Sequence, residues 1–536
     1  MKTPKIQLSL FLFFFSVFVL TGQGSIQSVD GKIMFFLTQA LVENQSVSFS
    51  EVVSIESIPG PKFSKYGLGM SILAIPFYIF GKVLSVLLGI ETSLTTQFSV
   101  SMINALLTAF SCLVIYQFAT NRFNFSPRTS LLLVSGFGLS TIAWYYSEDF
   151  MSEPATTFFL LSAVYFVTSK DPATRKWDLF TAGTFLALAV SCRLAVLVTI
   201  PGFIIYQWAV WAESKEKNAS KLVMDLMRPA TPVVLVLIVI MIYNYIRFAD
   251  PLETGYEKFA GQFVVGFVGL LFSPGKSIFL FNPLTVLGCL SFPLFFREQR
   301  NVMLLFGWLI VSHLLLFSFW GDWPGGMGWG PRLMLVVMPY LILPVGFLIG
   351  EYKQVVRIPV IMLLICGVLT QLPSVTVNIA RYYYEMSRDF GSLSSERILF
   401  SPKYSQLIGQ FKQVAKVFEN LDDDGKLVIK WYNRCTVPQC GWVSKELEQK
   451  LDIGECPVCG GEKRNHLVSR YSLDIVRCTD CSHGYLDPRI KYEDIHKIYW
   501  NDTTSAAIFS TPTQIKVDSL KYDYGLKLAD TWGFVS

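Results

Sequence analysis

Long apolar stretches recur along most of this chain, and they limit the folds that it can adopt. A helix that crosses a bilayer needs about 20 predominantly apolar residues. Only 16% of the 536 residues are charged, whereas a soluble protein carries about 25%. The sequence therefore predicts an all-α polytopic membrane protein and excludes a disordered, collagen-like or small disulfide-rich chain. We expect eleven transmembrane helices, at 6–24, 96–119, 129–147, 151–168, 178–191, 194–211, 230–247, 279–296, 302–320, 333–350 and 358–376.

The orientation of these spans depends on two segments. The first stretch, 6–24, follows two lysines as a signal peptide does, but so many spans follow that we expect it to stay as a helix with a cytoplasmic N-terminus. Segment 66–90 is also apolar enough to span, yet counting it would place every later basic loop outside, against the positive-inside rule. Its glycines and Pro76 suit irregular backbone buried in protein. We therefore predict an interfacial or re-entrant element there, with these parts on the outer face: 25–95, 248–278, 321–332 and the chain after 377.

Asp30 stands out in the first outer loop. It leads the stretch 33–43, in which apolar residues recur at helical spacing, so this stretch can lie on the bilayer surface. An aspartate held where apolar surroundings exclude water can have its pKa tuned for general-base catalysis. Aspartate is also a favoured N-cap at the start of a helix. The sequence leaves both interpretations of Asp30 open.

A second acidic group, Glu148, Asp149 and Glu153, falls between two predicted spans on the same face. Carboxylates packed between apolar helices are costly unless they bind something. We interpret Glu148 and Asp149 as contacts to an acceptor, a metal or a basic partner, and the alternative is a hydrated turn that caps a helix. A divalent metal at this outer site has no further support in the sequence.

Cations and tryptophans also gather on the outer face. A cation inside an apolar segment marks a functional site by default, and charge-assisted hydrogen bonds from cations suit a lipid-linked phosphate. The alternative is that long side chains snorkel at the ends of spans. Indole faces stack on sugar rings and also anchor helices at membrane interfaces. The residues concerned are Lys62, Lys65, Arg193, Lys276 and Arg332, with Trp323 and Trp329.

Asp30 after the first span is followed by Lys65-Tyr66-Gly67-Leu68-Gly69 running into Ala74-Ile75-Pro76-Phe77-Tyr78, and later by Ser273-Pro274-Gly275-Lys276 and Gly330-Pro331-Arg332. The order of these motifs resembles the GT-C superfamily of polyprenyl-phosphate-dependent glycosyltransferases, on the side of family 39 and the protein O-mannosyltransferase-like enzymes. The resemblance covers residues 6 to 410. It implies a multi-span fold that moves a sugar from a polyprenyl-phosphate carrier to a hydroxyl of a glycan, lipid or protein on the non-cytoplasmic face.

The resemblance also implies roles for single residues. Asp30 matches the catalytic base, and Arg193 falls where relatives place a basic residue near the lipid phosphate. Family members often pair two acidic residues after the first span, but Gly31 follows Asp30 here. A second carboxylate must therefore come from elsewhere, and Glu148 and Asp149 are the candidates.

The tail carries a different signal. Cys456-x2-Cys459 and Cys478-x2-Cys481, eighteen residues apart, fit a four-cysteine zinc site closely, and three disulfides that include Cys435 and Cys440 are the alternative. The tail also resembles the zinc-binding head of class I methyltransferases, which implies a structural zinc. No glycine-rich cofactor loop follows, so we do not expect methyl transfer. The outer placement of the tail conflicts with a thiolate zinc site, because such sites are usual in reducing compartments.

We therefore predict an integral multi-pass protein of the cell membrane with a small zinc-ribbon-like C-terminal domain. The expected parts are a GT-C-like membrane domain (1–377), a membrane-proximal linker (378–430) and the tail (431–536). Its partners would be a polyprenyl-phosphate-linked sugar, an acceptor and membrane lipids, with no nucleic acid. The rival function is a transporter or lipid flippase, which should show repeats with paired interrupted helices, and no convincing repeat is found. A scaffold that only presents the zinc ribbon leaves Asp30 and Arg193 unexplained.

Overall fold

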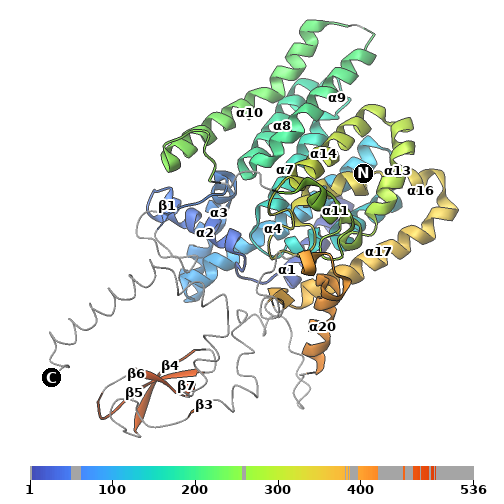
Figure 1. The fold of residues 1–536 in the computed structure, drawn as a ribbon. Coiled ribbons are helices and arrows are strands. Elements are labelled where there is room, and N and C mark those ends of the chain that lie inside the picture. Colours follow the sequence, from blue (N-terminus) through green and yellow to red (C-terminus); the bar gives the residue numbers. More distant parts are fainter. Residues whose placement is uncertain are drawn as a thin grey trace. The chain divides into compact units, whose positions relative to one another are not determined.

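The chain divides into two compact units in the computed structural model. The first comprises 1–379 and 394–431, and the second comprises 380–393 and 432–536. Figure 1 shows helices through the first unit and a small group of strands in the second. The structure describes residues 3–49, 62–215, 217–255, 261–380, 382–383, 386, 396–419, 451–452, 463–470, 473–481, 484–487 and 489–490.

The first unit is built almost entirely from helices, as the apolar stretches predict. One short antiparallel ladder pairs β1 (Ser48–Phe49) with β2 (Lys62–Phe63). The α-helices are α1 (Thr3–Thr21), α2 (Val29–Glu43), α3 (Leu68–Leu88), α4 (Thr92–Gln117), α5 (Pro127–Ser140), α6 (Ala143–Tyr146), α7 (Ser152–Val167), α8 (Arg175–Cys192), α9 (Ile200–Glu213), α10 (Ala219–Phe248), α11 (Phe263–Phe272), α12 (Ile278–Phe281), α13 (Thr285–Glu298), α14 (Arg300–Ser318), α15 (Met338–Ile342), α16 (Val345–Glu351), α17 (Lys353–Thr376), α19 (Glu396–Leu399) and α20 (Gln406–Glu419). Shorter turns are the π-helix η1 (Phe118–Arg122) and the 3-10 helices η2 (Leu194–Thr199), η3 (Arg332–Val337) and η4 (Pro402–Tyr404).

Seven helices of the described chain are long and apolar enough to cross a membrane, which supports an integral multi-pass protein. They are Leu68–Leu88, Thr92–Arg122, Leu194–Glu213, Ala219–Phe248, Arg300–Ser318, Arg332–Glu351 and Val355–Thr376. The other predicted spans contain shorter or interrupted helices. The predicted span 129–147, for example, breaks after α5, where the amide of Ile142 donates to Asn282 Oδ1 at 2.8 Å instead of continuing the helix. The count of eleven spans stays a prediction.

Segment 66–90 differs from the expectation of irregular backbone. It forms the continuous helix α3, with Pro76 inside it. Its glycines allow close packing instead: a Cβ on Gly69 would lie 2.2 Å from Ser191 Oγ of α8, and a Cβ on Gly81 would lie 2.6 Å from Thr96 Cα of α4. The interpretation of these glycines was therefore wrong, because glycine serves close helix contacts as well as irregular turns. The interfacial placement of the segment stays a prediction.

The buried centre of the first unit lies around α7 and α4. Helix α7 is buried along most of its length, and its hydroxyl groups bond back to its own backbone, as Thr156 Oγ1 does to Ser152 O at 2.7 Å. Such back-bonding lets polar side chains sit inside an apolar bundle. The N-terminus of α7 carries Glu153, and η3 packs beside this helix.

The second unit is described only in part. Its strands β4 (Arg464–Arg470), β5 (Leu473–Cys478) and β6 (Gly484–Asp487) form an antiparallel sheet in that order, and β3 (Leu451–Asp452) pairs with β7 (Arg489–Ile490). Cys478 is buried and Cys481 is exposed. Cys456 and Cys459 lie outside the described residues. The zinc ribbon therefore stays a prediction.

Candidate functional site

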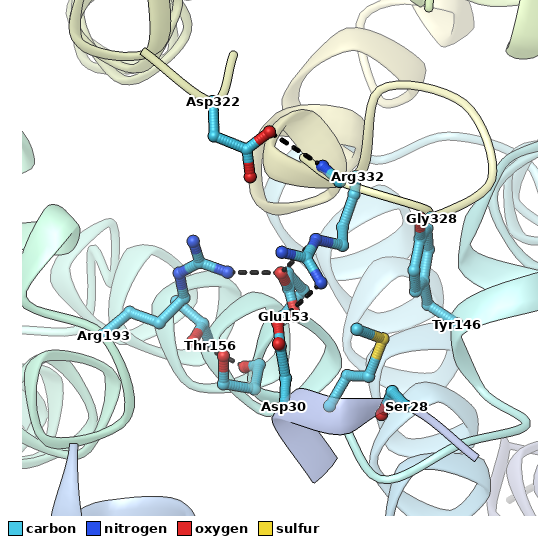
Figure 2. A network of polar contacts seen from close by, with 12 residues as sticks. Ser28, Asp30, Tyr146, Glu153, Thr156, Arg193, Asp322, Gly328 and Arg332 are labelled. Atoms are coloured by element: carbon cyan, nitrogen blue, oxygen red, sulfur yellow. Dashed lines mark hydrogen bonds and ion pairs between the residues drawn. The ribbon is translucent and has the colours of Figure 1, made fainter. Parts of the chain in front are cut away.

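Four charged side chains from distant parts of the chain form one network (Figure 2). Arg332 Nη1 donates to Asp30 Oδ2 at 2.8 Å, and Arg332 Nε lies 3.3 Å from Glu153 Oε1. Arg193 Nη1 donates to the same oxygen of Glu153. Glu153 is 3% exposed and Asp30 is 27% exposed. Negative and positive charges alternate along the network, which offsets the cost of removing them from water.

Asp30 lies in the first turn of α2 but does not cap this helix. The N-cap is Ser28, whose backbone is extended and whose Oγ accepts from the amide of Gly31 at 3.1 Å. The Asp30 carboxylate instead accepts from Tyr66 Oη at 2.6 Å and from Arg332. The N-cap interpretation of Asp30 is therefore wrong, because Ser28 already supplies the cap.

The surroundings keep Asp30 ionised. Burial on its own raises the pKa of Asp30, but the charge of Arg332, the hydrogen bonds from Tyr66 and Arg332, and the charge of Lys65 together hold this pKa below its usual value. Each oxygen of a carboxylate can accept more than one hydrogen bond. Asp30 therefore keeps the capacity to accept a further hydrogen bond from a hydroxyl.

Asp149 is bound to backbone amides in the loop before α7. Its carboxylate accepts from the amides of Gln27 at 3.2 Å, Ser28 at 2.8 Å and Phe150 at 2.7 Å. Burial raises the pKa of Asp149, and these amides act in the opposite direction. Asp149 thus ties the start of α2 to the loop before α7. These contacts give Asp149 a positioning role and no support as an acceptor or metal contact; its neighbour Glu148 is 1% exposed.

The second carboxylate of the site is Glu153, which belongs to the acidic group recognised in the sequence but was not among the predicted acceptor or metal contacts. Gly31 cannot be replaced by an acidic residue, since a Cβ there would lie 2.4 Å from the carbonyl oxygen of Phe150. Glu153 reaches Arg332 and Arg193 from the start of α7 instead. Its sequence signal was a glutamate at the head of an apolar stretch. Any glutamate in the first turn of a helix gives the same signal, because its negative charge interacts favourably with the helix dipole.

Lys276 and Arg332 point into the protein, so neither snorkels. Lys276 is 1% exposed, and its Nζ donates to the carbonyl oxygens of Gly328 at 2.7 Å and Gly326 at 3.3 Å. Burial, helped by the charge of Arg332 and opposed by Asp322, lowers the pKa of Lys276 to about 7. Lys276 therefore binds the glycine-rich loop that precedes Arg332.

The two tryptophans predicted as a sugar platform are buried. Trp329 has no exposed surface, donates from Nε1 to Gln371 Oε1 at 2.9 Å and packs edge-on against Phe281. Trp323 is 6% exposed, and its ring fills the space where a Cβ of Gly269 would stand. Neither indole presents an open face, because the loop folds inward. We therefore assign them a packing role.

The segment between β2 and α3 borders Asp30. Lys65 is exposed, with Nζ 5.6 Å from the centroid of the Tyr66 ring. The side chain of Lys62 lies outside the described residues. Arg247, at the end of α10, donates to the carbonyl of Ser64 and stacks 3.9 Å from the centroid of Tyr243. Tyr66 and Arg247 were missed as site residues, although Tyr66 stood in the Lys-Tyr-Gly motif.

The described residues hold no group of three or more His, Cys, Asp and Glu side chains that could bind a metal ion. The carboxylates of the network are each occupied by arginine or tyrosine donors. The site combines the ionised carboxylate of Asp30, the phenol of Tyr66, and Glu153 with its two arginine partners, all joined by hydrogen bonds and ion pairs. Such a set can take a proton from a hydroxyl and stabilise an anion.

Comparison with known proteins gives likenesses in structure only. No protein-family model and no curated protein matches the sequence. The chain is similar to ArnT from Cupriavidus metallidurans bound to undecaprenyl phosphate, with 11% identity, a TM-score of 0.48 and coverage of 85% of this chain and 83% of that one. It is also similar to archaeal oligosaccharyltransferase AglB from Archaeoglobus fulgidus in complex with an inhibitory peptide and a dolichol-phosphate, with 10% identity, a TM-score of 0.43 and coverage of 81% and 56%. Neither supports the methyltransferase-like interpretation of the tail.

Proposed function

We propose that the chain is a membrane glycosyltransferase that moves a sugar from a polyprenyl-phosphate carrier to an acceptor hydroxyl on the non-cytoplasmic face. The observation that carries this proposal is the chain of contacts from Asp30 through Arg332 and Glu153 to Arg193. The motif resemblance of the sequence agrees with it. In this proposal Asp30 is the general base, and Arg332, Arg193 and Lys65 are the cations that face the phosphate.

The chemistry of the transfer needs both a carboxylate base and cations. The carrier phosphate leaves as a stabilised anion and needs little acid assistance, whereas the acceptor hydroxyl is a weak nucleophile until a base takes its proton. A carboxylate within hydrogen-bonding reach can do this. Cations held in place beforehand stabilise the charge that develops on the leaving phosphate. The bond from C1 of the sugar to the phosphate oxygen breaks as the bond to the acceptor oxygen forms, and the proton of the hydroxyl passes to Asp30.

Glu153 explains how two arginines stay ordered before a phosphate binds. Its carboxylate accepts a hydrogen bond from Arg193 and forms an ion pair with Arg332, and it lies deeper in the protein than Asp30. A guanidinium has five donors, so Arg193 and Arg332 retain donors for phosphate oxygens while Glu153 holds their orientation. We therefore propose that Glu153 positions these arginines and does not itself contact the reacting atoms.

A transfer assay tests the proposed function. Purified full-length protein would be incubated with a panel of sugars linked to undecaprenyl phosphate and to shorter polyprenyl phosphates, together with membrane acceptors. We expect transfer with at least one donor and loss of transfer in Asp30→Asn. No turnover with any donor, together with substrate flux in proteoliposomes, would instead establish the transporter or flippase.

The placement of the site on the non-cytoplasmic face has its own test. Single cysteines would be introduced at positions 217 and 263 in a background without other reactive cysteines. The basic loop around Lys217 should lie in the cytoplasm, and Phe263 should lie outside. An impermeant thiol reagent added to intact cells should label position 263 only, and labelling of position 217 would contradict the topology.

We also propose that the tail binds one structural zinc through Cys456, Cys459, Cys478 and Cys481. The spacing of the two Cys-x2-Cys pairs supports this. The test is the zinc content of the purified full chain, with Cys456→Ser and Cys478→Ser as variants. One zinc per chain that both substitutions remove is the expected result, and disulfide bonds among these four cysteines in the native protein would contradict it.

A further inference from the structure

We infer that Gln406, the first residue of α20, positions Arg332 for the transfer reaction. The inference rests on the proposed function, in which Arg332 contacts the reacting groups. Gln406 lies beyond the last predicted span, in a stretch where the sequence predicted a linker. The structure nevertheless groups residues 394–431 with the first unit.

Arg332 owes its direction to the turn that precedes it. Gly330 has φ +56°, and a Cβ there would lie 2.8 Å from the Phe281 ring, so this turn requires glycine. The amide of Arg332 donates to the carbonyl of Gly330 at 3.0 Å. Pro331 adds a fixed φ between the two residues. A displacement of the backbone at 328–330 is therefore passed on to the guanidinium of Arg332.

Gln406 binds this turn with both ends of its amide group. Its Oε1 accepts from the amide of Gly330 at 3.0 Å, and its Nε2 donates to the carbonyl of Gly328 at 3.2 Å. The Gly328 carbonyl also accepts from Lys276 at 2.7 Å. Gln406 is 2% exposed, so water cannot replace these bonds without opening the structure. Two side chains from different segments thus converge on one carbonyl oxygen.

The residues before Gln406 bind the loop that carries Lys276. Ser405 Oγ donates to the carbonyl of Pro274 at 2.6 Å, and the amide of Gly275 donates to the carbonyl of Leu399 at 3.2 Å. One short segment, 399–406, therefore contacts both loops that supply buried cations to the site. A membrane-proximal linker with no role at the site would not need buried hydrogen bonds to both loops.

Gln410 provides a matched control on the same helix. It is fully buried, as Gln406 is, and its Nε2 donates to the carbonyls of Pro373 at 3.2 Å and Val377 at 2.5 Å. These partners belong to the end of α17 and not to the turn before Arg332. Gln406→Met removes the bonds to Gly328 and Gly330, and Gln410→Met removes those to Pro373 and Val377, each at nearly constant volume. A residue that merely docks α20 would give the same result at either position.

The experiment measures local order and catalysis separately in the full-length protein. Hydrogen exchange followed by mass spectrometry should show faster exchange in a peptide that contains Gly330 in Gln406→Met, and wild-type exchange there in Gln410→Met. In the transfer assay, Gln406→Met should lower kcat by about 10- to 100-fold with little change in the KM of the acceptor, because a misplacement of about 1 Å costs roughly this much. Gln410→Met should keep kcat within a factor of about 3 at a similar melting temperature.

The outcomes separate the two proposals. Absence of transfer by the wild type would refute the proposed function, and the exchange data would still decide whether Gln406 orders the turn. Equal losses of kcat in the two variants, or faster exchange at Gly330 with unchanged kcat, would overturn the inference. If Gln406→Met does not fold, Gln406→Glu takes its place. Its carboxylic acid repeats both bonds only when protonated, so its kcat relative to wild type should fall as the pH rises from 5 to 8, and a constant ratio would overturn the inference.

Discussion

Helix α8 has a cluster of buried charges at each end, and the two clusters are built differently. Its first residue, Arg175, binds Asp225 of α10 at 3.0 Å, and Arg228 binds the same carboxylate at 2.9 Å. At the other end Arg193 directly follows the helix and binds Glu153. The 18 residues of α8 separate the clusters by about 27 Å at 1.5 Å per residue.

The Asp225 cluster comes from helices that pack on one another. Arg175 also donates to Gln207 Oε1 of α9 at 3.1 Å, so the start of α8 is joined to the middle of α9 and to the first part of α10. Arg228 is three residues from Asp225 on the same helix. Neighbouring helices need no further structure to bring these groups together. We interpret this cluster as a structural link between neighbouring helices.

The cluster around Arg332 brings together residues from 30 to 332, and the segments that carry Asp30 and Arg332 are held by further buried polar bonds. Asp149 holds the start of α2, and Lys276 and Gln406 hold the turn before Arg332. Buried charges that only tie helices together need no such support. Buried ion pairs occur in both clusters. The cluster around Arg332 differs because additional hydrogen bonds fix the segments that carry its charged residues. Site variants should therefore lose catalysis, and variants of the Asp225 cluster should lose stability.

The largest expected effect among the arginines is at Arg332. Arg332→Gln removes a cation that contacts both carboxylates, and kcat should fall by about 100- to 1,000-fold, as for loss of one donor that stabilises a transition state. The comparison is Arg175→Gln, which removes an arginine of the Asp225 cluster. Steady-state kinetics and thermal melting of both proteins provide the check. If Arg175→Gln lowers kcat as far as Arg332→Gln, the distinction between the clusters fails.

Glu153→Gln should show a combined effect. The substitution leaves Arg193 and Arg332 with a neutral partner, and kcat should fall by about 10- to 100-fold through their misplacement. Removing one partner of a buried ion pair also destabilises a protein, by about 3–5 kcal/mol at the upper end. Melting curves and kinetics should therefore both change. Unchanged kcat at a lowered melting temperature would reduce Glu153 to a structural residue.

Tyr66→Phe tests the hydrogen bond to Asp30 and has a matched control. Tyr78 Oη donates to Glu43 Oε1 at 2.6 Å, the same length as the bond from Tyr66 to Asp30. A hydrogen bond to a charged group contributes about 1.5–3 kcal/mol, so Tyr66→Phe should lower kcat by about tenfold. Tyr78→Phe should leave kcat unchanged. Equal kinetics for the two variants would show that Tyr66 does not act through Asp30.

The dependence on pH should be the smallest effect. The ionised form of Asp30 is the base, and its pKa lies below the usual value of about 3.8 because Arg332, Tyr66 and Lys65 outweigh burial. Protonation should therefore cost no activity until the pH falls below about 4. Arg332→Gln removes the charge that lowers the pKa of Asp30 most. In this variant the loss of kcat at acidic pH, the acid limb of the pH profile, should therefore begin at a higher pH. An acid limb at the same pH in both proteins would contradict this account of Asp30.

Some features of the fold and the site followed from residue patterns. Apolar stretches of about 20 residues predict membrane helices because every backbone polar group must be satisfied inside a bilayer. A charge inside an apolar stretch is costly, so Arg193 stands out from its neighbours in the sequence alone. Asp30 stands out because it leads the amphipathic stretch 33–43, although its contacts in the fold decide its role. Ser28 and Asp30 are both good N-cap residues, and only the backbone angles show that Ser28 is the cap.

Other features depend on contacts far apart in the chain, which one sequence does not reveal. The burial of Trp329 depends on Gln371 and Phe281, and the direction of Lys276 depends on carbonyls fifty residues later. Glycines in α3 resemble helix breaks in the sequence, because the helices that approach them come from other parts of the chain. The role of Glu153 depends on the positions of two arginines that lie 40 and 179 residues away. Long-range geometry, not residue type, was the missing information.

The most direct test compares Asp30→Asn with Asp225→Asn in the transfer assay. Both substitutions replace a carboxylate of a buried arginine cluster with an amide of nearly the same size. Loss of a general base should lower kcat of Asp30→Asn by about 100- to 10,000-fold with little change in melting temperature, while Asp225→Asn should melt at a lower temperature and keep a near-normal kcat. Near-normal turnover in Asp30→Asn would contradict the central claim, since it would leave Asp30 with a structural role alone.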